Sequence, residues 1–336
     1  MIRLAHLSDL HYTTATRSRV RTLLDAVVQS GTDHLLITGD LTEDGSDVQM
    51  RGLFSLLRSC GYDESRSLTV IPGNHDLYGF IYKTFNTPGH VVGGIRGLLS
   101  LTATARTLWD FRQRVATYSV GDYRRSAEKF TERFAPAFGD CMSAQSFCKG
   151  MPFVKLMSDD FVLVGIDSNF YMPRIYGIGN VLRSARRVIR THDLALLGEN
   201  LSGSTGWVDT HSLDTILSWP EVKSRRKIVL LHHCLYDLDH LIERTSRPYA
   251  MEMRLCNRDE VVEILQRHNV ELVLHGHEHA SDDYRLPGGI RVLNSGGAQS
   301  GCFHLIDVTA KAFDIRLTIA GESDSRSSHG REVVLP

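Results

Sequence analysis

Short apolar runs alternate with longer amphipathic stretches through the first third of the chain. The runs at Ile2–Leu7, His34–Thr38 and Ser67–Ile71 have the length and apolar character of buried strands. Between them, Arg17–Ser30 and Val48–Cys60 have the spacing of helices. Because buried apolar strands that alternate with helices form parallel βαβ units, this pattern predicts an α/β fold.

Similar runs continue along the rest of the chain. A helix is expected at Glu260–His268, where Val261, Ile264 and Leu265 lie on one face. The further expected strands are Phe161–Ile166, Lys227–Leu231, Val270–Leu274, Ile290–Asn294, Phe303–Val308 and, at a sheet edge, Lys311–Ile319. We therefore expect a single domain over residues 1–320, followed by a polar tail at residues 321–336 that frays.

Two long stretches interrupt this pattern. Residues 83–150 are too long for a simple connection, and Phe130, Phe134 and Phe138 recur within them at helical spacing. We therefore expect a helical, cap-like insertion. Residues 171–204 form a second excursion, in which four arginines share one helical face: Arg183, Arg186, Arg187 and Arg190. This face is either a solvated surface or a contact with an anionic membrane or lipid substrate.

Composition narrows the class of protein without naming its partner. The formal net charge is −1 and 42% of residues are hydrophobic, which indicates a globular protein and predicts no nucleic-acid partner. No apolar run reaches the about 18 residues of a membrane span, and Ile2–Leu7 is too short for a signal peptide. The six cysteines form no CxxC pair, so we expect reduced thiols and a cytoplasmic protein.

Five polar clusters each follow a predicted strand, and together they hold many of the 16 histidines. They are Asp9-Leu10-His11, Gly39-Asp40, Gly73-Asn74-His75-Asp76, His232-His233 and His275-Gly276-His277-Glu278-His279. Open α/β sheets bind ligands in the loops at the carboxyl ends of their strands, so we expect these clusters to meet in one site. A carboxylate and an imidazole two residues apart point the same way and can hold one cation.

The order of these clusters resembles the signature of the calcineurin-like metallophosphoesterases, which reads DxH, GD, GNHD, VxxH and GHxH. The resemblance extends from residue 2 to about residue 300, outside the two interruptions. It implies two packed β-sheets flanked by helices, a four-layer sandwich with a di-metal centre at one edge. It also implies that His75 lies beside the leaving group of the substrate.

The same resemblance implies seven metal ligands, divided between two ions. One ion would be held by Asp9, His11 and His279, the other by Asn74, His232 and His277, and Asp40 would bridge them. In the fourth cluster, the VxxH match favours His232 over His233 as the ligand.

The chemistry of these residue types agrees with the resemblance. Oxygen and nitrogen ligands without a thiolate suit Mn or Fe, with Zn or Co as alternatives. Two ions about 3.5–4 Å apart lower the pKa of a bridging water and clamp a phosphoryl group for in-line attack. His75 would donate a proton to the leaving group, and a carboxylate, from either Glu43 or Asp76, would orient its ring.

Departures from relatives bear on the substrate. The segment Gly39–Gly45 lacks the arginine of serine/threonine protein phosphatases, and Glu43 stands where purple acid phosphatases have a tyrosine. GDLTEDG and LHHC resemble the bacterial cyclic-nucleotide phosphodiesterases, although Cys234 replaces a proline of that branch. We therefore expect a phosphoesterase that hydrolyses a small phosphodiester or nucleotide. The alternatives are a pyrophosphohydrolase of a nucleotide-linked sugar or lipid, and an inactive scaffold with the same fold.

Overall fold

The structure is a computed structural model that describes residues 1–77, 120–144, 150–169, 205–245, 250, 253–320 and 333–334. The expected helical insertion at residues 83–150 is therefore described only in part. The second excursion at residues 171–204, with its arginine face, lies outside the described residues, as does nearly all of the tail at 321–336.

The first sheet is built from the N-terminal strands and the last long strands of the chain. Its order is β12 (Phe313–Ile319), β11 (Cys302–Val308), β1 (Ile2–Leu7), β2 (His34–Thr38) and β3 (Leu68–Ile71). The three N-terminal strands pair in parallel, whereas β11 and β12 pair antiparallel. Helices α1 (Arg17–Gln29) and α2 (Asp47–Ser59) connect the parallel strands, within one residue of the predicted limits.

The second sheet has eight strands and is also mixed. In order they are β13 (Val333–Val334), β9 (Ser281–Arg285), β10 (Arg291–Ser295), β8 (Leu272–His275), β7 (Arg226–Leu230), β6 (Phe161–Gly165), β5 (Phe153–Leu156) and β4 (Met142–Ser143). The four central strands, β10, β8, β7 and β6, run parallel, and antiparallel strands extend the sheet on both sides. The apolar pattern does not reveal β9, because its sequence SDDYR is polar, or the short strands β4 and β5.

The remaining described helices flank these sheets. They are α6 (Val120–Arg133), the 3₁₀ helix η1 (Ala135–Phe138), α9 (Thr210–Leu217), α10 (Pro220–Lys223), α11 (Leu238–Arg244), α13 (Arg258–Arg267) and α14 (Gly297–Ser300). Phe130, Phe134 and Phe138, which recur at helical spacing, do not share one helix, because α6 ends at Arg133 and η1 begins at Ala135. Pro136 lies in the first turn of η1, and proline cannot continue an α-helix, since it lacks an N–H and clashes with the preceding turn.

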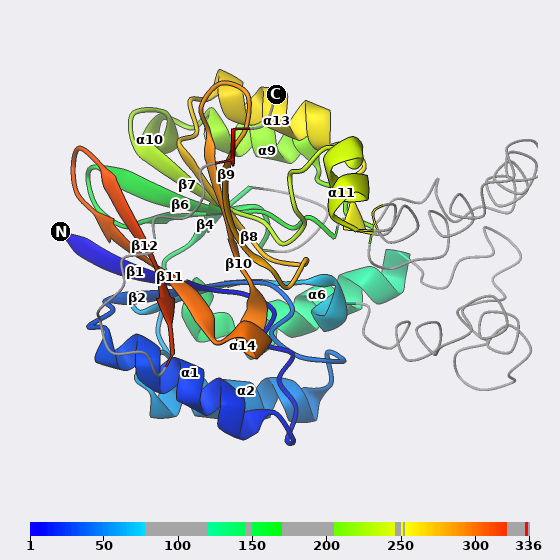
Figure 1. Ribbon diagram of the computed structural model, residues 1–336, viewed down its shortest axis with the longest axis vertical. Coiled ribbons are helices and arrows are strands. Elements are labelled where there is room, and N and C mark those ends of the chain that lie inside the picture. The colour runs from blue at the N-terminus through cyan, green and yellow to red at the C-terminus, as the bar shows by residue number, and fades with distance from the viewer. Residues whose placement is uncertain are drawn as a thin grey trace, which may run out of the picture.

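Alternate side chains of the central strands enter two different cores. In β7, Ile228 and Leu230 belong to the core that includes the strands of the five-stranded sheet, whereas Val229 belongs to the core that includes residues of α9 and α13. Figure 1 shows α1 and α2 outside the five-stranded sheet, and α9 and α13 outside the eight-stranded one. The two sheets and two helical layers form the four-layer sandwich that the sequence predicts.

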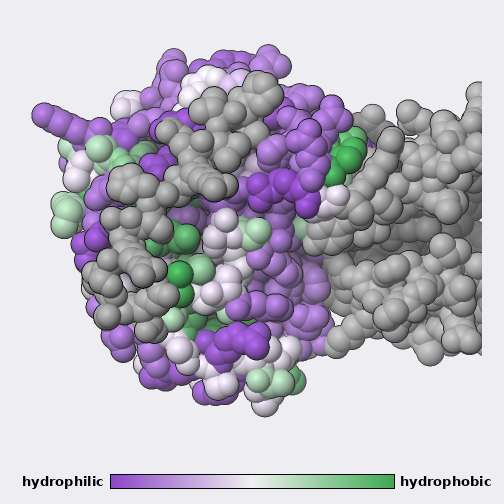
Figure 2. All heavy atoms as spheres, in the orientation of Figure 1, coloured by the Kyte–Doolittle hydropathy of each residue, from purple (hydrophilic) through white to green (hydrophobic). Residues whose placement is uncertain are grey.

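No described helix is both long and apolar enough to cross a membrane. On the face shown in Figure 2, hydrophilic residues cover most of the described surface, with smaller hydrophobic areas between them.

Candidate metal centre

The five polar clusters meet where the carboxyl ends of the parallel strands of both sheets come together. Main-chain hydrogen bonds join their loops: the Asp9 N–H donates to the Gly39 oxygen (3.1 Å), and the Gly276 N–H donates to the His232 oxygen (3.1 Å). The His277 N–H donates to the Asp9 carboxylate at 3.0–3.1 Å. Loops from the two sheets therefore hold one another in place at the site.

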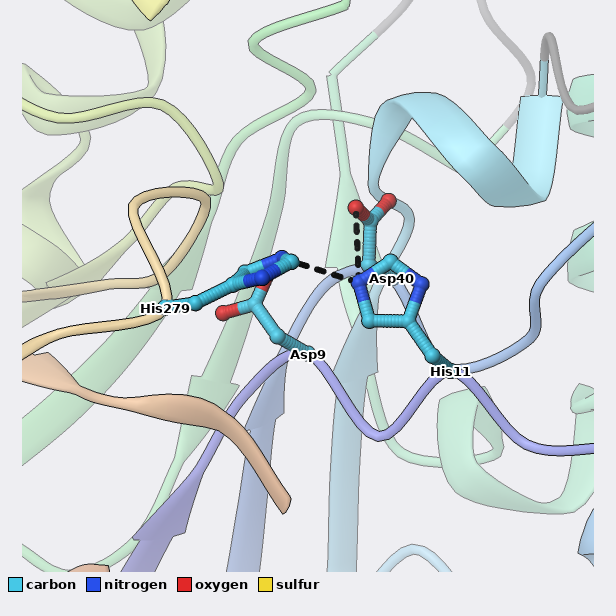
Figure 3. A group of neighbouring side chains, drawn as sticks. All are labelled: Asp9, His11, Asp40 and His279. Carbon is cyan, nitrogen blue, oxygen red and sulfur yellow. Dashed lines mark hydrogen bonds and ion pairs between the residues drawn. The ribbon is translucent and has the colours of Figure 1, made fainter. Parts of the chain in front are cut away.

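The first group of candidate ligands contains Asp9, His11, Asp40 and His279, whose ligand atoms lie within 4.8 Å of one another. The Nε2 atoms of His11 and His279 are 2.9 Å apart, and His279 Nε2 is 3.5 Å from an Asp9 oxygen. Figure 3 shows these side chains pointing toward one another, with Asp9 and His11 on one loop and Asp40 and His279 on others. Ligands about 2.1 Å from one ion are about 3.0–3.4 Å apart at angles of 90–109°. The spacing of the group therefore fits a single ion.

The second group contains Asp40, His232 and His277. His232 Nε2 lies 3.4 Å from Asp40 Oδ2, 3.2 Å from His277 Nδ1 and 2.9 Å from the Asn74 side-chain oxygen. Asp40 Oδ2 is also 3.7 Å from His11 Nε2 in the first group. One carboxylate oxygen therefore faces both groups, as the sequence predicts for a bridging ligand.

The tautomer of His232 distinguishes it from its neighbour His233. His232 Nδ1 lies 2.8 Å from the Thr38 main-chain oxygen, which only accepts, so Nδ1 carries the hydrogen. The lone pair on Nε2 is then directed into the second group. His233 Nδ1 bonds to Ser168 Oγ instead, and His233 belongs to neither group. The structure thus brings His232, and not His233, together with Asp40 and His277.

The backbone at these positions is strained. Six non-glycine residues among those described have positive φ, and five of them belong to the seven predicted ligands. The five are Asp9 (49°), His11 (41°), Asp40 (47°), His277 (78°) and His279 (56°). Such conformations are uncommon outside glycine and concentrate at functional sites, where surrounding structure enforces them.

His75 lies beside the two groups and forms a third cluster of possible ligands with His11 and Glu43. Its N–H donates to Asp40 Oδ1 (2.8 Å), and its ring Nδ1 is 2.8 Å from the main-chain oxygen of Glu43. This ring nitrogen therefore contacts the main chain of Glu43, and not the carboxylate of Glu43 or Asp76 that was expected to orient it. The Asp76 carboxylate instead accepts from the N–H groups of Leu41, Thr42 and Gly73, and joins the two loops around His75.

The Glu43 carboxylate contacts the ring of His11 and not that of His75. One of its oxygens lies 3.1 Å from His11 Nδ1, on the side of the imidazole that faces away from His279. Burial opposes a charge on His11, but the carboxylates of Glu43, Asp40 and Asp9 outweigh it and raise the pKa of His11 to about 9. Burial likewise opposes a charge on His232, and the Asp40 carboxylate raises its pKa to about 9. The centre is thus an anionic environment that favours a cation.

The model of the calcineurin-like phosphoesterase family matches residues 2–281. The chain belongs to this family. No curated protein matches the sequence. A dimetal phosphatase from Danio rerio is similar in structure, with a TM-score of 0.52 and 14% identity over 94% of this chain and 95% of that one.

A purple acid phosphatase from yellow lupin (Lupinus luteus) seeds has a TM-score of 0.53 and 11% identity, over 97% of this chain and 52% of that one. At such low identity these likenesses show the shared fold. Family membership makes this chain a metal-dependent phosphoester hydrolase, and its His/Asp groups indicate a binuclear site for divalent metals.

Sequence analysis missed a sixth cluster in this phosphoesterase, Asp167-Ser168-Asn169, which follows β6. Ser168 Oγ accepts from the N–H groups of both His232 and His233, each at 3.1 Å. The Asn169 side chain donates to the Pro72 oxygen (3.0 Å), next to the loop of Asn74 and His75. The cluster follows an apolar strand, as the other five do. This position after a strand could have indicated that the cluster belongs to the site, although its residue types do not suggest metal binding.

Proposed function

We propose that this phosphoesterase hydrolyses a small phosphodiester or nucleotide by in-line displacement at phosphorus. The observation that carries the proposal is the convergence of two groups of oxygen and nitrogen atoms on one oxygen of Asp40. Two bound divalent ions supply an activated water and positive charge for the phosphate oxygens. The side chains supply the positions of these ions and a proton for the leaving group.

The residues fit two such ions. Asp9, His11 and His279 would hold the first, Asn74, His232 and His277 would hold the second, and Asp40 would contact both. Neither group contains a cysteine among the described residues, which favours Mn or Fe, with Zn or Co as alternatives. Cys234, two residues after His232, points its sulfur at the Met253 oxygen (3.7 Å) and is buried.

His75 is the proposed proton donor. Because its Nδ1 faces the Glu43 carbonyl oxygen, which only accepts, Nδ1 carries a hydrogen and the ring is fixed. Nε2, 4.0 Å from Asp40 Oδ2, is then directed toward the centre. When the bond from phosphorus to the leaving oxygen breaks, a proton on Nε2 passes to that oxygen.

The preference for a phosphodiester or nucleotide rests on the resemblance of GDLTEDG and LHHC to cyclic-nucleotide phosphodiesterases. We would test it by assaying the Mn-loaded enzyme on phosphomonoesters, cyclic nucleotides, dinucleotides and nucleotide sugars. Cleavage of a phosphodiester that stops on addition of a chelator is the expected result. Activity confined to phosphomonoesters or to pyrophosphate bonds would overturn the preference. No hydrolysis of any ester by the metal-loaded enzyme would overturn the mechanism.

A further inference from the structure

Helix α6 forms hydrogen bonds to two loops near His75, the loop that follows β6 and the loop that contains Gly45. Its Tyr123 hydroxyl donates to the carboxylate of Asp167, in the cluster that follows β6. One turn and a half later, Lys129 Nζ donates to the main-chain oxygen of Gly45 (2.9 Å). None of these residues belongs to the two groups of candidate metal ligands.

The bond from Tyr123 leads to the loop that carries His75. The other oxygen of Asp167 accepts from the main-chain N–H (2.7 Å) and the side-chain amide (3.0 Å) of Asn169. The same amide donates to the Pro72 oxygen at 3.0 Å, three residues before His75. Tyr123, Asp167 and Asn169 are all buried. Hydrogen bonds between buried groups are strong and restrict the arrangements that their members can adopt.

The bond from Lys129 leads to the acceptor of His75. Gly45 is two residues after Glu43, whose carbonyl oxygen lies 2.8 Å from His75 Nδ1. With φ of +62°, Gly45 passes so close to the main-chain oxygen of Asp76 that a side chain has no room there. Lys129 also lies 3.4 Å from the Asp47 carboxylate at the start of α2. The position of this loop therefore depends on α6.

The helix itself is firmly seated. Phe130 and Phe134 are buried, their rings 5.0 Å apart, and Phe134 meets the ring of Phe54 of α2 edge to face at 5.9 Å. Arg133 lies 3.5 Å from Asp47. A rigid helix that bonds to two loops fixes the distance between them.

We propose that Tyr123 and Lys129 are positioning residues, through which α6 holds His75 and its acceptor in the geometry for proton donation. The inference rests on the proposed role of His75. It assigns α6 no part in holding the metal ions, because the chain of bonds reaches the main chain beside His75 and not the ligand side chains.

The test compares Tyr123→Phe and Lys129→Met with matched controls at the opposite, amino ends of the strands. Tyr62 is a buried tyrosine just before β3, and Lys227 Nζ also donates to main-chain oxygens (2.9 and 3.3 Å), so the controls are Tyr62→Phe and Lys227→Met. We would measure kcat on an alkyl phosphodiester and on a p-nitrophenyl ester, with the metal content and melting temperature of each variant.

Tyr123→Phe should lose about tenfold on the alkyl ester, a part of the about hundredfold to ten-thousandfold that a general acid provides. On the p-nitrophenyl ester, whose leaving group needs little protonation, the loss should stay below about threefold. Lys129→Met should show the same split, and both variants should keep two metals. The controls should not change the ratio of the two rates.

A double-mutant cycle separates positioning from general destabilisation. In a His75→Ala background, Tyr123→Phe should add no further loss on the alkyl ester, because the group that it positions is absent. Additive losses, equal losses on both esters, or loss of a metal would each overturn the inference. If the Tyr123→Phe protein does not fold, the Lys129→Met variant tests the inference instead, because Lys129 is half-exposed. A wild-type enzyme that is inactive on all esters would instead refute the proposed function.

Discussion

Asp40 presents the same oxygen atom to both candidate metal groups, 3.7 Å from His11 Nε2 and 3.4 Å from His232 Nε2. No other predicted ligand has this position. Its pKa lies well below the usual range, because the nearby histidines outweigh the effect of burial and keep it charged. The residue is therefore the point at which one substitution affects both ions.

Asp40→Ala should abolish binding of both metals and reduce activity below detection, whereas His279→Ala should spare the second group. Elemental analysis after loading with excess Mn provides the measurement. The control is Asp25→Ala on α1, where the half-exposed carboxylate pairs with Arg21 at 2.8 Å. An Asp40→Ala protein that still holds two metals would show that the carboxylate does not bridge.

Glu43 has two separable contacts, one from its side chain to His11 and one from its main chain to His75. Glu43→Gln removes the charge beside His11 and leaves the carbonyl oxygen in place. Changes in groups that orient a ligand typically cost about 10–100-fold in metal affinity. We therefore expect about tenfold weaker Mn binding in a chelator-competition titration.

The leaving-group dependence of the Glu43→Gln enzyme, at saturating Mn, should match that of the wild type. The control is Glu64→Gln, because Glu64 is exposed and its carboxylate pairs with the exposed Arg66. Unchanged Mn affinity in Glu43→Gln would show that the carboxylate does not support His11.

His75→Ala removes the proposed proton donor without touching a predicted ligand side chain. The variant should keep both metals and lose about a hundredfold or more on an alkyl phosphodiester, and much less on a p-nitrophenyl ester. Replacement of the exposed His211 by Ala is the control. Loss of one metal would identify His75 as a ligand, and equal losses on both esters would indicate an electrostatic role.

At the scale of the elements, the ends of the strands decide the geometry of the site. Gly39 ends the β2 segment with φ of +92°, and a side chain at this position would collide with the His232 ring. Gly61 has a similar φ of +85°, but open space surrounds its α-carbon. Substitutions at these two glycines therefore distinguish the effect of backbone strain from the effect of a collision with a ligand.

Gly39→Ala and Gly61→Ala should each lose about 1–2 kcal/mol of unfolding free energy from the left-handed backbone. Only Gly39→Ala should also displace His232, so it should bind one metal where Gly61→Ala binds two. Urea unfolding and elemental analysis measure the two effects. Equal metal content in both variants would contradict the role assigned to the close approach at Gly39.

Some strands could be predicted from the sequence and others could not. Buried parallel strands are apolar on both faces, so β2 and β7 were visible as the runs HLLIT and KIVLL, and the polar clusters after them marked the site. Strand β9 was not visible, because pairing with β10 and not apolarity defines it. The acceptor of His75 was also hidden, since it is a main-chain oxygen, which residue identity does not reveal.

At the scale of the whole molecule, buried histidines couple stability to pH. His34 is the first residue of β2, with its ring nitrogens 2.9 Å from the Arg66 oxygen and 2.7 Å from Thr69 Oγ1, and His304 is buried in β11. Burial disfavours the charged ring and lowers the pKa of each to about 4 from 6.5. Neither residue belongs to the candidate metal groups.

These two histidines should make the metal-free protein lose stability in acid. Above pH 6.5 both rings are neutral in the folded and unfolded states, so they contribute no pH dependence. Between pH 6.5 and 4 the unfolded chain binds protons that the folded chain does not, so the free energy of unfolding falls as the pH falls. At pH 5 the cost should be about 2 kcal/mol of unfolding free energy per histidine.

His304→Gln should therefore show a loss of stability between pH 7 and pH 5 that is about 2 kcal/mol smaller than that of the wild type. Urea unfolding at both pH values measures this difference. The exposed His211→Gln should follow the wild type, because a solvated ring has no burial cost to remove. A His304→Gln protein with the wild-type pH dependence would show that this ring is protonated, or reached by solvent, in the folded state.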